Sequence, residues 1–205
     1  MLVLWIVGDE MKLDPRQAKS KEKLHEAYLS LLIEGHNQLS IQQVCAKAAV
    51  TRPTFYKLYK DINELRKAMI EELLSELKQA LTILNPKPLD EITEEEKLEN
   101  LILLFEHIQK NHIAYKTLLI YQTDALFTNG IQEILKEYVR DGIYFSKTRP
   151  YLINVNEQLL IAYAAGAYLE CVRWWITTDF EMPPVEMAKT LIELSLNGPY
   201  IKRLI

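Results

Sequence analysis

Apolar residues recur at helical spacing along nearly the whole chain. In the first such segment Leu24, Tyr28, Leu31 and Leu32 line up with Lys and Glu between them, as on the buried face of a helix. Only six glycines occur in 205 residues, fewer than a fold of short strands and turns requires. The sequence therefore predicts an all-α, nine-helix fold. The expected helices lie near residues 15–34, 40–48, 51–60, 61–81, 94–110, 113–122, 129–147, 157–178 and 182–197.

The clearest break in this pattern is Asn85-Pro86-Lys87-Pro88, because a residue before proline is disfavoured in a helix. Charge is also unevenly distributed: residues 12–70 contain 11 Lys/Arg against 6 Asp/Glu, whereas the whole chain has a net charge of −4. A basic segment on an acidic body suggests contact with a polyanion, although chance variation in surface charge would look the same. We expect a DNA-binding domain at residues 14–61, and a connecting helix with a C-terminal domain at residues 62–205.

Two short helices with separate N-terminal caps are expected to follow one another closely. Ser40-Ile-Gln-Gln43 is a capping box, and Thr51 caps the next helix with Pro53 in its first turn. Asp61-Ile-Asn-Glu64 is a third cap, which begins the long helix that follows. About two residues join the two short helices, so these must cross steeply, as in a helix-turn-helix. In the second helix Phe55 and Leu58 are predicted to point inward. The predicted outward face consists of Thr51, Arg52, Thr54, Lys57 and Lys60.

This outward face suits the major groove of DNA. Arginine can bind guanine, threonine can contact base edges, and lysine can bind phosphates. The alternative is a solvated face on an ordinary helical corner. Residue order, local charge and capping together favour the DNA-binding interpretation.

Residues 39–65 resemble the signature of the TetR (tetracycline-repressor-like) family at Val44, Ala48, Val50, Thr54, Tyr56, Tyr59 and Leu65. Arg52-Pro53-Thr54 is similar to the base-reading run of the family's type member. The resemblance implies a homodimeric transcriptional regulator that binds double-stranded operator DNA. The expected DNA contacts are Ser40, Gln42, Thr51, Arg52, Pro53, Thr54, Tyr56, Lys57, Tyr59 and Lys60.

Two positions depart from the family pattern. Ala49 replaces the turn glycine, at a cost of roughly 1 kcal/mol if that residue is left-handed. Ile62 replaces a lysine that lies near a phosphate in the family. These departures leave open an alternative, a TetR-like co-activator or adaptor that binds another protein and has weak or no affinity for DNA.

The segment 159–176 is apolar on nearly every side, so it must be covered on every side. A second subunit could cover one face, although a central helix in a monomer would look similar. In the family the last two helices form the dimer interface. The resemblance therefore implies interface positions at Ala162, Gly166, Trp174, Ala188, Leu191 and Ile192.

Aromatic residues are concentrated in the second half of the chain. At helical spacing such residues are more often core than ligand contacts, but the family places an effector cavity among these helices. We expect a small apolar or aromatic effector. The candidate contacts are Phe105, Tyr115, Tyr121, Tyr138, Trp174 and Trp175.

Other functions lack support in the sequence. The four histidines and two cysteines do not show metal-ligand spacing, glycines never cluster into a phosphate loop, and no catalytic set is evident. We therefore expect neither an enzyme nor a cofactor. The longest apolar-or-glycine run, 159–169, is too short to span a bilayer, and residues 2–7 make a poor signal peptide, which predicts a cytoplasmic protein. Residues 1–13 are expected to be an extension, from an upstream start or left from cloning, or else a short segment that packs on the body.

The sequence as a whole predicts an effector-responsive repressor of a palindromic operator. Its dimer would present two recognition helices about one duplex turn apart, roughly 34–36 Å.

Overall fold

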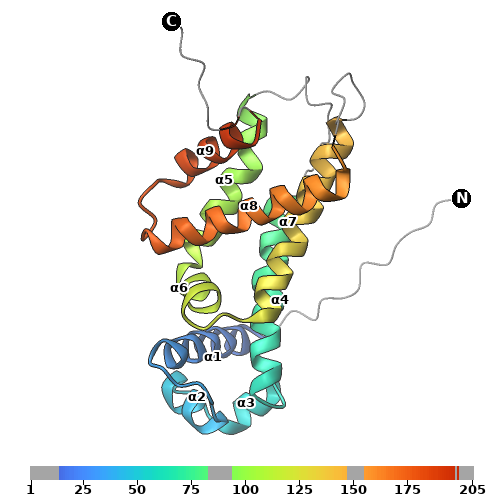
Figure 1. Ribbon diagram of the computed structural model, residues 1–205. Helices are drawn as coiled ribbons and strands as arrows, with labels where there is room; N and C mark the ends of the chain where they lie inside the picture. The colour runs from blue at the N-terminus through green and yellow to red at the C-terminus, as the bar shows by residue number, and fades with distance from the viewer. Residues whose placement is uncertain (1–13, 83–93, 147–154, 197, 199–205) are drawn as a thin grey trace, which may run out of the picture. The chain divides into compact units, whose positions relative to one another are not determined.

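A computed structural model describes residues 14–82, 94–146, 155–196 and 198 of the chain. Within these ranges it contains nine α-helices, one π-helical turn and no strand (Figure 1), so the prediction of an all-α fold is confirmed. The expected extension at 1–13 and the proline-containing break at 85–88 lie outside the described residues. The elements are α1 (Pro15–Ile33), α2 (Ile41–Ala48), α3 (Arg52–Leu58), α4 (Ile62–Leu81), α5 (Glu94–Lys110), α6 (His112–Lys116), η1 (Thr117–Tyr121), α7 (Ala125–Ser146), α8 (Glu157–Thr177) and α9 (Pro184–Leu196).

The chain divides into two compact units, one ending at Ala68 and the other beginning at Met69. The division falls within α4, later than the boundary expected at residue 61. In the first unit α1 packs against α2 and α3 (Figure 1). Its core contains Leu24, Val44, Phe55 and Leu65, each fully buried.

Local capping explains where the helices of this unit begin. Asp14 accepts a hydrogen bond from the Arg16 N–H at 2.8 Å, and Pro15 occupies the first turn of α1. The predicted capping box of α2 is present: the Ser40 hydroxyl accepts from the Gln43 N–H at 3.2 Å, and the Gln43 side chain accepts from the Ser40 N–H at 3.0 Å. The Asp14 cap and the predicted capping box thus fix the starts of α1 and α2.

The turn between α2 and α3 requires a left-handed residue, and this residue is Ala49. Its φ and ψ are 52° and 42°, and its N–H donates to the carbonyl oxygen of Ala46. A Cβ atom is disfavoured in this conformation because it crowds the following carbonyl oxygen. Ala49, which stands where the family has glycine, therefore strains the backbone at this turn.

Ala49→Gly is expected to stabilise the protein by about 1 kcal/mol, because glycine adopts this conformation without steric penalty. Urea denaturation followed by circular dichroism measures the change. Gly35→Ala is the matched control, since Gly35 has a φ of +88° and open space around the position of a Cβ. That substitution should lower stability by a similar amount. A neutral or destabilising effect of Ala49→Gly would mean that residue 49 does not adopt the left-handed conformation.

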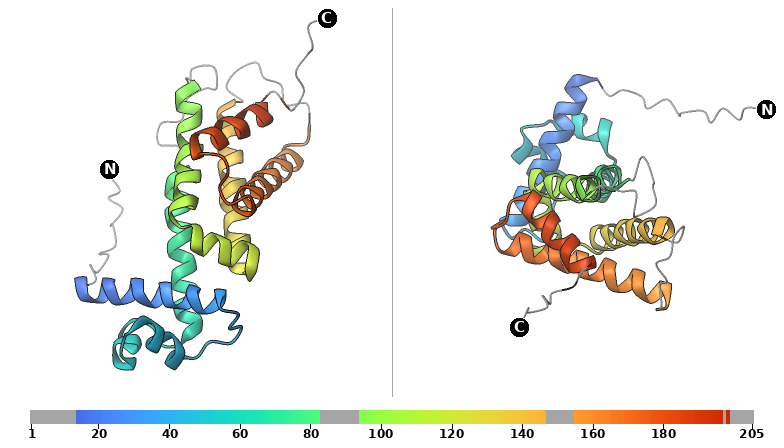
Figure 2. Two further views of the ribbon diagram at one scale, coloured as in Figure 1. Left: turned by 90° about the vertical axis from the view of Figure 1, so that its left-hand side faces the viewer. Right: turned by 90° about the horizontal axis from the view of Figure 1, so that it is seen from above.

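In the second unit α5 packs against α9 and α7 against α8 (Figure 2). Leucine, isoleucine and aromatic residues make up most of its interior. The fully buried aromatic side chains are Phe105, Tyr115, Phe127 and Trp175. The Phe105 and Trp175 rings meet edge to face, with centroids 5.1 Å apart, an arrangement that favours aromatic packing.

Three boundaries differ from the sequence prediction. Helix α7 begins at Ala125 rather than near residue 129, because the Asp124 carboxylate accepts from the N–H groups of Leu126 and Phe127 and caps it. Helix α3 ends at Leu58, since Tyr59 adopts an extended conformation. The segment expected as one helix near 113–122 is α6 followed by the π-helical turn η1, in which the Leu119 carbonyl oxygen accepts from Nη1 of Arg173 at 2.7 Å.

Candidate functional site

Helix α3 presents a polar and basic surface, as the sequence predicted. Arg52, Pro53 and Lys57 are exposed, and the Tyr56 side chain is 57% exposed. Thr51 lies at the N-terminal cap, where its hydroxyl accepts from the Thr54 N–H at 3.3 Å and contacts the Thr54 hydroxyl at 2.9 Å. The cap thus holds the N-terminal end of α3 with its charged side chains facing outward.

Arg52 is tied to helix α2 by its side chain. Its Nη2 donates to Oε1 of Gln42 at 3.0 Å, and both residues are exposed. This bond brings two of the expected base-reading side chains to one edge of the helix pair. Ser40 is exposed at the start of α2, but its hydroxyl is already engaged with the Gln43 side chain at 2.8 Å.

Tyr59 is a correction to the expected set of DNA contacts. Its side chain is only 6% exposed, its hydroxyl lies 2.9 Å from Nε2 of His25, and its ring packs edge to face on Phe55. The extended backbone at the end of α3 turns this ring into the core. Tyr59 therefore stabilises the helix-turn-helix from within and cannot reach a groove.

Lysine residues extend the basic surface beyond α3. Lys57 and Lys60 are both exposed. The Lys60 N–H donates to Glu64, whose own N–H donates to Asp61 at 2.8 Å, so the predicted cap of α4 is present. Lys57 lies near the end of α3 and Lys60 lies between α3 and α4, where both can contact a phosphate backbone.

Helix α8 carries an exposed apolar face. Tyr163 is 73% exposed, Ala162 is exposed, and a Cβ added at Gly166 would meet nothing within 4 Å. Leu159 and Trp174 are also exposed along the same helix. Glu170, which is exposed and whose carboxylate lies 3.4 Å from Nε of Arg173, interrupts this face between Gly166 and Trp174. A largely apolar face of this kind is typical of an interaction surface.

Helix α9 contributes less to that face than expected. Ala188 and Leu191 are 0% and 2% exposed, since they pack inside their own protomer, so both are wrong as interface positions. Ile192 is half-buried. The apolar stripe of α9 is therefore mainly the contact of α9 with α5.

The six expected effector contacts separate into two groups. Tyr121 and Trp174 are 60% and 46% exposed, so they lie at the surface of the second unit, and their role as effector contacts stays a prediction. Phe105 and Tyr115 are fully buried, and burial also raises the pKa of Tyr138. Trp175 is fully buried and donates its indole N–H to the Met182 carbonyl oxygen at 2.8 Å.

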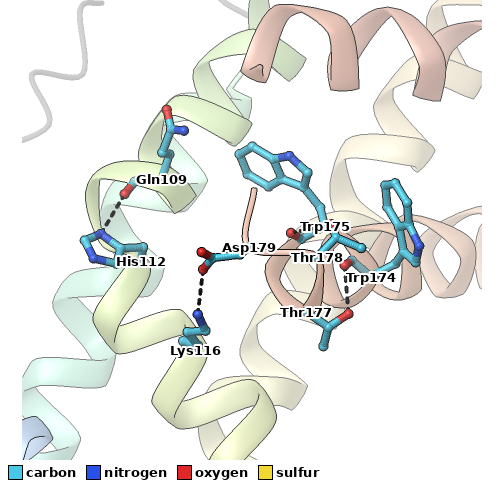
Figure 3. A network of polar contacts seen from close by, with 8 residues as sticks. All are labelled: Gln109, His112, Lys116, Trp174, Trp175, Thr177, Thr178 and Asp179. Carbon is cyan, nitrogen blue, oxygen red and sulfur yellow. Dashed lines mark hydrogen bonds and ion pairs between the residues drawn. The ribbon is translucent and has the colours of Figure 1, made fainter. Parts of the chain in front are cut away.

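Figure 3 shows how the adjacent residues Trp174 and Trp175 diverge, since neighbouring positions on a helix point about 100° apart. Beyond them the chain turns through two left-handed non-glycine residues, Asp179 and Phe180. The Asp179 carboxylate accepts from Nζ of Lys116 on α6 at 2.8 Å, and this lysine lowers the pKa of the carboxylate. Helix α6 is thereby connected to the end of α8.

One buried polar group was missed by the sequence analysis. His107 on α5 is 9% exposed and contacts the Tyr115 ring at 5.6 Å between centroids. A single histidine on an apolar helix face looks like an ordinary core residue, so the sequence does not distinguish His107 from its neighbours. Within the described part of the chain no group of acidic, histidine or cysteine residues could hold a metal ion.

None of the described helices combines the length and apolar character needed to cross a bilayer.

Comparison with known proteins identifies the family. The model described as "Transcriptional regulator C-terminal region", of the TetR family, matches residues 95–197, half of the chain. The chain therefore belongs to the TetR family of transcriptional regulators. No curated protein matches it by sequence.

Solved structures share the fold at low sequence identity. A TetR transcriptional regulator from Streptococcus agalactiae is 22% identical, with a TM-score of 0.62 over 88% of this chain and 95% of that one. A TetR-family regulator from Syntrophomonas wolfei is 16% identical, with a TM-score of 0.64 over 91% and 99%. FadR from Bacillus subtilis, solved in complex with stearoyl-CoA, is 15% identical, with a TM-score of 0.62 over 87% and 99%. These similarities concern the fold alone.

Proposed function

We propose that this regulator binds a palindromic DNA operator as a cytoplasmic homodimer and represses transcription until an effector binds. The observation that carries the proposal is the exposed, basic surface of α3, which follows α2 after three residues and is held by its own cap. Such a helix fits the major groove with its N-terminal residues near the bases. No catalytic role is proposed.

The exposed face of α8 supports the homodimer. A two-fold interface is formed by the same surface on both subunits, so one apolar face is sufficient. Tyr163 and Trp174 are the kind of large side chains that are enriched in the centres of such interfaces. Two subunits would also provide the two recognition helices that a palindrome requires.

An effector is supported by the aromatic interior of the second unit. Phe105, Tyr115 and Tyr138 come from three different helices of that unit. The stearoyl-CoA held by FadR shows that a protein of this fold can accommodate an apolar chain. Repression would be relieved if the effector bound more tightly to the state whose recognition helices do not match the operator.

Arg52→Ala is expected to weaken operator binding by about 1–3 kcal/mol and to relax preference at one base pair, because a bidentate contact to guanine is lost. The operator would be mapped by footprinting upstream of the chain's own gene. Fluorescence titration against this operator and a scrambled duplex then measures both affinities. The loss should appear on the operator and be much smaller on the scrambled DNA.

Lys57→Ala and Lys60→Ala are the controls, because phosphate contacts are independent of sequence. Each should weaken binding to both duplexes and lower the dependence of log K on log salt concentration by about one. Equal loss on both duplexes for Arg52→Ala would assign Arg52 to phosphate instead. If the wild-type chain bound neither duplex with a steep salt dependence, DNA reading would be refuted and the adaptor would be favoured.

A further inference from the structure

Among the described residues of the second unit, four buried side-chain polar atoms have no hydrogen-bond partner, and two of them belong to side chains whose rings are in contact. These two are Nε2 of His107 on α5 and the hydroxyl of Tyr115 on α6. The two side chains are 9% and 0% exposed, and their rings contact each other edge to face. A buried polar group without a partner is unfavourable, and native proteins rarely retain one without a reason.

The neighbouring Asn111 determines which nitrogen of His107 carries the proton. Nδ2 of Asn111 donates to the backbone oxygen of His107 at 3.1 Å, which fixes the orientation of the amide. The same Nδ2 lies 3.2 Å from Nδ1 of His107, so Nδ1 must accept. In the neutral ring the proton is therefore on Nε2, and Nε2–H is a donor without an acceptor.

The surroundings favour the neutral form of this histidine. Burial lowers the pKa of His107, and Lys110 acts in the same direction, whereas the Glu76 carboxylate, 3.6 Å from Nδ1, opposes them. A protonated ring would also carry an N–H at Nδ1, and this donor would face the donor N–H group of the Asn111 side chain. His107 and Tyr115 thus provide two donors from adjacent rings, in an interior closed on another side by Phe127, 5.1 Å from Tyr115.

We propose that His107 and Tyr115 form the polar end of a binding site for an uncharged apolar molecule with a carbonyl oxygen. Two donors on neighbouring rings can match the two lone pairs of such an oxygen. An anionic group is disfavoured because the Glu76 carboxylate lies beside His107. The proposal rests on the effector-binding role proposed above and specifies the chemical class of the effector.

Thermal unfolding of the full-length protein tests the site with two matched pairs of probes. Acetophenone and 2-heptanone carry a carbonyl oxygen, whereas ethylbenzene and heptane have similar shapes without one. The ketones should raise the melting temperature of the wild type more than the hydrocarbons do. Tyr115→Phe should remove that difference, and its own melting temperature without probe should equal or exceed that of the wild type, because an unpaired hydroxyl is removed.

Tyr168→Phe is the matched control. The Tyr168 hydroxyl lies 3.0 Å from Oγ of Ser195, so its removal should lower the melting temperature while the response to ketones persists. In ¹⁵N–¹H spectra of the imidazole, the ketones should shift the Nε2 proton of His107 downfield.

Three results would each overturn the site: ketones and hydrocarbons acting equally, none of the four probes acting, or Tyr115→Phe lowering stability as much as Tyr168→Phe. The last would mean that an ordered water already satisfies the hydroxyl.

Operator titration without probes separates this site from the proposed function, since Tyr115→Phe should bind DNA like the wild type. Failure of the wild type to bind DNA would refute the regulator's mechanism and leave the ketone result unaffected.

Discussion

Gly166→Glu is expected to leave the protomer folded and to raise the dissociation constant of the dimer at least about 100-fold. Within the protomer a Cβ at this position meets nothing within 4 Å, and replacing a helical glycine favours the helix. In a two-fold dimer formed by α8, the same position would bury an unpaired carboxylate from each subunit, which costs several kcal/mol. Sedimentation equilibrium over a range of micromolar concentrations measures the change.

Gly142→Glu is the control for this substitution. Gly142 is also a helical glycine with open space around it, but it lies on α7. It should stay dimeric and retain the melting temperature of the wild type. A wild-type protein that sedimented at 24 kDa under these conditions would refute the dimer, and a dimeric Gly166→Glu variant would place the interface away from α8.

Short-range patterns in the sequence were sufficient to predict the helix-turn-helix. Ser40 with Gln43, Thr51 with Pro53, and Asp61 with Glu64 each define a helix start through contacts within one turn. Such contacts depend on neighbours in the chain, so they can be recognised without knowledge of the fold. The missed start of α7 has the same type of signal in Asp124.

Long-range packing could not be predicted in the same way. The family resemblance implied that the last helix contributes to the dimer interface, but it does not say whether an apolar residue of α9 meets another subunit or the protein's own α5. Ala188 and Leu191 were therefore assigned to the wrong partner. Tyr59 shows the same limit, because its inward direction depends on where α3 ends and on His25, which is distant in the sequence.

The two donors at His107 and Tyr115 lie beyond any sequence pattern. Each residue taken singly resembles an ordinary core position on an apolar helix face. Their significance arises from the absence of a partner after α5 and α6 are packed, together with the amide of Asn111, which fixes the tautomer. Such a site is recognised by counting donors and acceptors in three dimensions.

Trp175→Ala is expected to lower the free energy of unfolding by about 3–5 kcal/mol, the usual range for removing a large buried aromatic ring. Trp175 is fully buried, meets Phe105 and Phe180 edge to face at 5.1 and 4.8 Å, and donates to the Met182 carbonyl oxygen. The substitution thus creates a cavity, removes two aromatic contacts and leaves a carbonyl oxygen without its donor. Urea denaturation followed by circular dichroism measures the loss.

Trp174→Ala, one residue earlier, is the matched control. Its side chain is 46% exposed, so removal from the protomer should cost less than about 1 kcal/mol. Both substitutions are compared in the Gly166→Glu background, in which loss of a dimer contact does not contribute. The two tryptophans are adjacent residues of the same helix, so the comparison isolates the direction in which each side chain points. Equal losses would mean that α8 does not direct Trp175 into the core and Trp174 toward a partner.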